Sequence, residues 1–220
     1  MDKIDVYLEI GKSRTFAGAL DWPGWCRSGR DEAAALQALF DYGPRYARAI
    51  RSARQGFEPP AALAALAVVE KIPGGMGTDF GAPEQIPAGD TRPVTLDELR
   101  RLIALLRACW KTFDAAAEAA AGHELSKGPR GGGRELEKIV AHVWEAEAAY
   151  VRRIGDQLDP GLPPREIRKA TLRALEHMAQ GTVPMVGPRG GARWPARYFA
   201  RRAAWHVLDH AWEIDDRTIG

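Results

Sequence analysis

Four amphipathic segments, each with the 3.6-residue periodicity of a helix, follow one another over residues 95–216. The first opens with the spacing of a capping box, in which the side chains of Thr95 and Glu98 satisfy free backbone amide donors. We expect helices over residues 95–121, 134–154, 165–180 and 194–216. Long helices joined by loops of 10–13 residues predict an all-α four-helix bundle.

The N-terminal third of the chain follows a different pattern. Two β-prone stretches, at residues 6–10 and 15–20, flank a Gly-Lys-Ser turn, so a hairpin is expected. A helix should follow over about residues 31–54, and the pair Gly43-Pro44 should kink or split it. Residues 66–72 predict one more strand. Together these patterns indicate a small α+β module.

A segment rich in glycine and proline separates the module from the helices. Residues 73–93 hold five glycines and four prolines, which is typical of an irregular linker. The expected organisation is therefore an α+β module over residues 1–72, a linker over residues 73–94 and a four-helix bundle over residues 95–220.

Composition argues against several classes of protein. The 31 Lys and Arg residues nearly balance the 29 Asp and Glu residues, so the net charge of +2 gives no general attraction to nucleic acid or to a membrane. No run of 18 apolar residues occurs, and the first residues lack a signal-peptide core. Two cysteines, Cys26 and Cys109, do not make a disulfide framework. We expect a cytoplasmic protein that acts on a small molecule.

Three histidines form a candidate metal site. His206 and His210 are four residues apart on the last predicted helix, so their Cβ atoms lie roughly 6 Å apart on one side. That spacing suits two imidazoles that bind one ion. A third ligand must come from another element, and His142 on the second helix is the natural candidate because bundle metal sites use facing helices. The remaining histidines, His123 and His177, are expected at the surface.

A helical-wheel comparison places the three candidate ligands at the margin of the core. The apolar stripe of the last helix comprises Phe199, Ala203, Val207 and Ile214, and His206 lies about 90° from its centre. A marginal position suits a site that water or substrate can reach.

Glu213 follows His210 by three residues, on the same side of the helix, and is the candidate catalytic residue. Three roles are open to it: a hydrogen-bond acceptor that orients a ligand, a general base, or a fourth ligand. Glu145 bears the same relation to His142 but points further towards solvent. A di-iron site would instead use Glu-x-x-His pairs, whereas this chain has His-x-x-Glu.

Residues 95–217 resemble the DinB-like metalloprotein superfamily, four-helix bundles with one histidine on the second helix and His-x-x-x-His on the fourth. The resemblance rests on His142 in LEKIVAHVWEAE and on His206 and His210 in RRAAWHVLDHAWEIDD. It implies that the three imidazoles hold a divalent ion, zinc or nickel, with the remaining positions open to water. For some members it also implies transfer or isomerisation reactions that use mycothiol, bacillithiol or glutathione.

The metal pattern and the resemblance lead to one expected function and one alternative. An ion with three imidazole ligands and an open position lowers the pKa of a bound water or thiol. We therefore expect a metal-dependent transferase or hydrolase for a small molecule, with a low-molecular-weight thiol as a candidate cofactor. The alternative is a non-catalytic binding protein whose metal site is structural or vestigial.

Two similar glycine-rich loops each precede a histidine-bearing helix: GPRGGGR at residues 128–134 and GPRGGAR at residues 187–193. Because helix N-termini attract anions, Arg130 and Arg189 are candidate cofactor-binding residues for an acidic group of the substrate or thiol. The alternative is flexible loops with solvated arginines. The loops meet at one end if the helices alternate in direction, whereas a crossover would separate them.

Tyr198, Trp205 and Trp212 recur every seven residues on the last helix, nearly opposite its apolar stripe. A row of large aromatic side chains is rarely left in water. We expect the row to pack against the N-terminal module or against a second subunit, and the second case predicts a homodimer.

The N-terminal module is similar to the small HicB-like antitoxin fold over residues 4–72. The shared features are a strand, Pro23-Gly24, a turn with Gly29, and a helix with Glu32, Ala33 and Leu36. No helix-turn-helix or basic arm accompanies them, so we expect a packing module rather than a repressor. Cys26, beside Trp25, is either a reactive thiol or a structural cysteine.

Overall fold

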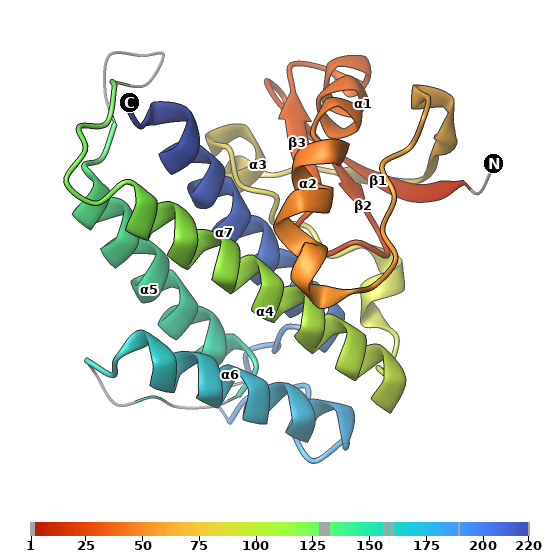
Figure 1. Ribbon diagram of the computed structural model, residues 1–220. Helices are drawn as coiled ribbons and strands as arrows, with labels where there is room; N and C mark the ends of the chain where they lie inside the picture. Colours follow the sequence, from red (N-terminus) through yellow and green to blue (C-terminus); the bar gives the residue numbers. More distant parts are fainter. Residues whose placement is uncertain (1–2, 128–132, 156–157, 159–160, 189, 220) are drawn as a thin grey trace.

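The computed structural model describes residues 3–127, 133–155, 158, 161–188 and 190–219. Over these residues the fold is α+β: a four-stranded mixed sheet near the N-terminus is followed by helices (Figure 1). The strands are β1 (Ile4–Ile10), β2 (Thr15–Ala19), β3 (Cys26–Gly29) and β4 (Leu66–Pro73). The helices are α1 (Glu32–Asp41), α2 (Gly43–Ile50), α3 (Met76–Phe80), α4 (Leu96–Ala119), α5 (Leu136–Arg153), α6 (Pro164–Ala179) and α7 (Ala196–Arg217).

The sheet has the strand order β3-β2-β1-β4. β1 and β2 pair antiparallel, with Val6 opposite Ala19, and β4 lies parallel to β1 on its other side. The predicted hairpin and the predicted strand at residues 66–72 are both confirmed. β3 is an addition to the expected fold, because its four residues, CRSG, carry no apolar alternation that would indicate a strand.

Both faces of the sheet are covered, which is why every residue of β2 is buried. On one face α1 packs against β2 and β3 and buries Ala35 and Leu39. On the other face Phe16 of β2 meets Trp205 of α7 edge to face, with ring centroids 6.0 Å apart. Helix α7 therefore lies directly against the N-terminal sheet.

The predicted split of the helix at Gly43-Pro44 is confirmed. α1 begins after Asp31, whose side chain accepts a hydrogen bond from the Ala34 backbone amide, and it ends at Asp41. Pro44 then lies in the first turn of α2, where its missing N–H is not needed.

The segment predicted as an irregular linker is partly regular and well packed. It contains α3 and a 3₁₀ turn at Ala88–Thr91. The buried carboxylate of Glu9 accepts hydrogen bonds from the Thr78 hydroxyl and from the backbone amides of Glu84 and Gln85. The many glycines and prolines of the segment permit tight turns here rather than a free tether.

The four long helices predicted after residue 95 are present, with ends close to the expected ones. The capping box is confirmed: the Thr95 amide donates to the Glu98 carboxylate at 2.9 Å, and the Glu98 amide donates back to the Thr95 hydroxyl at 3.3 Å. α4, α5 and α7 lie alongside one another, and α6 crosses below them (Figure 1). Within the described residues, no helix has the length and apolar character to cross a membrane.

The aromatic row of α7 packs against the N-terminal part of the same chain. The Tyr198 hydroxyl donates to the backbone carbonyl of Glu84 at 2.9 Å, and the Trp212 ring lies 5.1 Å from the Tyr42 ring. Together with the contact between Trp205 and Phe16, this confirms the first of the two expected coverings. Since the row is already covered, the homodimer stays a prediction without this support.

Candidate metal centre

The three predicted ligands meet between two helices. His142 comes from α5, and His206 and His210 come from successive turns of α7. Their ring centroids are 4.7–5.1 Å apart, and one ring nitrogen from each lies within 4.8 Å of the other two. The i,i+4 spacing on one helix and the facing histidine on another thus produce the convergence that the sequence predicts.

The distances between these nitrogens fit one ion. Two nitrogens bound to a tetrahedral zinc ion at about 2.0–2.1 Å are about 3.3 Å apart. The Nε2 atoms of His142 and His206 are 3.3 Å apart, and the candidate ligand atoms of all three rings lie within 4.8 Å of one another. Within the described part of the chain, no fourth histidine, cysteine or carboxylate joins the group, which leaves coordination positions for water or substrate.

His142 and His210 lie at the margin of the core as expected, whereas His206 does not. His206 is only 6% exposed, whereas His142 and His210 are half-buried. The prediction for His206 was wrong because the helical wheel assumed one core face on the last helix. α7 in fact packs against α4 and α5 on one side and against the sheet on the other. The exposed part of the histidine group therefore belongs to His142 and His210.

Burial also keeps two of the rings neutral. It lowers the pKa of His206 well below its usual value, and the neighbouring His210 and Arg202 side chains lower it further. Burial lowers the pKa of His142, and the neighbouring His210 side chain lowers it further. Neutral imidazoles expose a nitrogen lone pair, which is the form that binds a metal ion.

Glu213 contacts His210 but does not belong to the candidate histidine group. Its Oε2 lies 2.8 Å from His210 Nδ1, and its Oε1 accepts a hydrogen bond from Arg217. The hydrogen bond to His210, helped by Arg217, lowers the pKa of Glu213, so the carboxylate is charged. Because Glu213 contacts Nδ1, the Nε2 atom of His210 is the one that remains to bind an ion. Glu213 thus has the first of the three roles considered for it, that of a hydrogen-bond acceptor that orients a ligand. Glu145 is exposed, as expected.

Two further side chains border the site and were not singled out from the sequence. The Tyr150 ring lies 5.7 Å from the His206 ring, and Arg202 precedes His206 by one helical turn. The signal for Arg202 was available, because residues 202, 206 and 210 follow one another at i,i+4 spacing along one side of α7.

The two glycine-rich loops, residues 128–134 and 187–193, are only partly described by the structure. Arg130 and Arg189 lie outside the described residues. The described flanks of the loops are at opposite ends of α7: the Arg134 carbonyl accepts from Arg217, and the Trp194 amide donates to the Arg153 carbonyl. The flanks of the two loops are therefore far apart, which is the arrangement expected if a crossover separates the loops.

The remaining histidines and the cysteines stand apart from the site. His123 and His177 are exposed, as predicted. Cys26 and Cys109 are buried and free, and burial raises the pKa of each thiol to about 12. A thiol so reluctant to ionise is a poor nucleophile, so the structural role of Cys26 is the one supported.

Comparison with known proteins gives no relative from which a role could be taken. No family model, no curated protein and no solved structure matches the chain.

Proposed function

We propose that the chain binds one divalent metal ion, zinc or nickel, through His142, His206 and His210. We further propose that residues 95–217 are a DinB-like four-helix bundle and that the protein is a metal-dependent transferase or hydrolase for a small molecule. A low-molecular-weight thiol is the candidate cofactor. The observation that carries the proposal is the convergence of three ring nitrogens, from two helices, within 4.8 Å.

The chemistry of the donor set supports an open catalytic site. An ion bound by three neutral imidazoles supplies a Lewis acid that lowers the pKa of a bound water or thiol. Structural zinc sites usually have four protein ligands, whereas three is typical of catalytic ones. The alternative is a non-catalytic protein whose metal site is structural or vestigial, and a structural site would usually have a fourth protein ligand.

The chain's own residues have separable roles in this proposal. His142 and His206 offer lone pairs because burial keeps them neutral. Glu213 holds His210 at Nδ1 and thereby fixes the direction of its Nε2. The deep position of His206 excludes bulk water from one side of the site, so substrate approaches past the half-buried rings. The HicB-like resemblance of the N-terminal module stays a prediction and is not needed for these roles.

Elemental analysis of purified protein, beside matched variants, tests metal binding. We expect about one zinc or nickel ion per wild-type chain, and loss of that ion in His142→Ala and His206→Ala. His123→Ala and His177→Ala, which change exposed histidines, should keep it. Since His206 is buried, circular dichroism and thermal unfolding must show that each variant is folded. A wild-type protein that stays metal-free after incubation with either ion contradicts the proposal.

The coordination of a bound ion separates the two functions. With Co²⁺ in place of zinc, an open site should change its visible absorption when a small thiol is added, because the thiolate enters the coordination sphere. A spectrum that no added thiol or anion changes indicates a closed site and supports the non-catalytic alternative.

A further inference from the structure

Arg202 lies beside the histidine group and has no counter-charge among the described residues. It is one helical turn before His206 on α7. Its Nη1 atom is buried without a hydrogen-bond partner in the described part of the chain. The same part of the chain holds no ion pair that involves Arg202. A buried guanidinium nitrogen without a hydrogen-bond acceptor lowers the stability of the folded state. A functional role for Arg202 would explain why it is present.

Arg201, the preceding residue, is a structural arginine whose N–H groups have hydrogen-bond acceptors within the protein. Arg201 is buried and donates to both carboxylate oxygens of Asp90 and to the backbone carbonyls of Ala19 and Leu20. Arg202 lies on the adjacent face of the helix, where its neighbours are the side chains of Trp205 and Tyr150. Its guanidinium carbon lies 4.7 Å from the Trp205 ring centroid and 5.8 Å from that of Tyr150.

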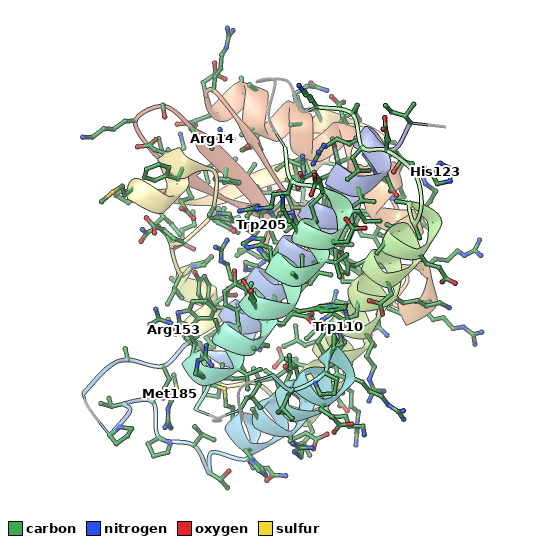
Figure 2. The ribbon with its side chains drawn as sticks, turned by 90° about the vertical axis from the view of Figure 1, so that its left-hand side faces the viewer. Arg14, Trp110, His123, Arg153, Met185 and Trp205 are labelled. Carbon is green, nitrogen blue, oxygen red and sulfur yellow. The ribbon has the colours of Figure 1, made fainter. Side chains whose placement is uncertain are left out.

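These aromatic contacts connect Arg202 to the histidines. Tyr150 faces Arg202 and also lies 5.7 Å, ring to ring, from His206. Trp205 lies 6.1 Å from His206. Figure 2 shows Trp205 between the sheet and α5, at the middle of the molecule. The rings of Tyr150 and Trp205 therefore lie next to both Arg202 and His206. The Cβ atoms of Arg202 and His206 are about 6 Å apart by helical spacing.

We propose that Arg202 binds the carboxylate of a short-chain acid whose sulfur or oxygen donor atom reaches the three-histidine centre. The inference rests on the proposed metal site and names the class of substrate or thiol that it accepts. A guanidinium packed between aromatic rings can bind a ligand through the N–H groups at its edge. Two such N–H groups, side by side, donate to the two oxygens of a planar carboxylate. The i,i+4 spacing places Arg202 and His206 on one side of α7, so one short acid can reach both side chains.

A matched pair of thiols tests the proposal by binding rather than by activity. 3-Mercaptopropionate and 3-mercapto-1-propanol share the thiol and the chain length and differ in the carboxylate. Each is titrated into Co²⁺-loaded protein while the thiolate-to-cobalt charge-transfer band is followed. We expect wild type to bind the acid about tenfold or more tightly than the alcohol. Arg202→Gln should reduce this preference to about twofold or less and leave the affinity for the alcohol unchanged.

Arg153→Gln is the matched control. Arg153 also stacks on a tryptophan, Trp194, but it is exposed and lies near the C-terminal end of α5 (Figure 2). It should keep the full preference for the acid. Arg202→Lys, which keeps the charge and loses the paired donors, should give an intermediate preference, and it replaces the glutamine variant if the latter does not fold.

The results of these titrations distinguish failure of the Arg202 proposal from failure of the proposed metal site. If cobalt binds and both thiols give the charge-transfer band, but Arg202→Gln keeps the wild-type preference, the role of Arg202 is overturned and the metal site stands. If cobalt does not bind to wild type, the metal site fails, and the inference fails with it.

Discussion

Arg201 and Asp90 form a buried pair in which two guanidinium nitrogens each donate to a carboxylate oxygen at 2.7 Å. The pair joins α7 to the segment between the sheet and the long helices. Asp90→Ala would leave a buried charge without its partner, so we expect the free energy of unfolding to fall by about 3–5 kcal/mol. Urea unfolding followed by circular dichroism measures this loss.

Asp97→Ala is the control for that variant. Asp97 pairs with Arg100 on the exposed surface of α4, so its removal should cost less than about 1 kcal/mol. Equal losses in the two variants would contradict the view that the buried pair holds α7 to the segment.

Local signals predicted much of this fold because they do not depend on distant parts of the chain. The capping box of Thr95 and Glu98 and the break at Gly43-Pro44 are decided within one helical turn. The approach of His142 to His206 and His210 also needed only helical spacing and the facing of two helices.

Features that depend on how the two halves pack were not predictable in the same way. His206 was expected at the margin of the core, but it is buried, and the rings of His142 and Tyr150 from α5 lie against it. The short strand β3 is held by pairing with β2 rather than by its own sequence pattern. Arg202 lay on the same i,i+4 series as the ligands, yet an arginine at that spacing is usually a solvated residue.

Gly18 in β2 leaves room for a neighbouring ring, which gives a second stability prediction. It lies opposite Tyr7 of β1, and a Cβ atom at Gly18 would be 2.4 Å from Tyr7 Cε1. Tyr7 is 1% exposed and has nowhere to move. Gly18→Ala should therefore lower the free energy of unfolding by about 1–3 kcal/mol through overpacking.

Gly191→Ala is the comparison for Gly18→Ala in a thermal-unfolding series. A Cβ atom at Gly191 has no neighbour within 4 Å among the described residues, so this change should be nearly neutral. A Gly18→Ala protein as stable as wild type would show that the sheet adjusts to the extra carbon.

Glu147 on α5 makes stability depend on pH. Burial outweighs the neighbouring Arg168 and raises the pKa of the Glu147 carboxyl from 4.5 to about 7. Between these values the unfolded chain releases the proton while the folded chain keeps it, so the folded state binds more protons. The free energy of unfolding should then fall as pH rises, by about 1.4 kcal/mol per pH unit and about 3 kcal/mol in all.

Glu147→Gln removes the titrating group and should remove this slope. The test is urea unfolding at several values between pH 4.5 and pH 7.5, compared between wild type and variant, since other groups contribute equally to both. Glu145→Gln, two residues away and exposed, should keep the wild-type slope. Parallel curves for wild type and Glu147→Gln would show that Glu147 is already charged in the folded protein.

Glu213 gives the sharpest test of how the candidate site is built. Its carboxylate lies 2.8 Å from His210 Nδ1 and is anchored by Arg217, so it orients a ligand without joining the ligand group. Loss of such an orienting partner typically weakens metal affinity about 10–100-fold and leaves the ligands in place. We expect this decrease for Glu213→Ala, measured by competition with a chromophoric chelator. Glu145→Ala removes the glutamate at the same spacing from His142, but from the surface, and should leave the affinity unchanged. If Glu213→Ala abolished binding altogether, as removal of His142 should, Glu213 would be a ligand and not an orienting group.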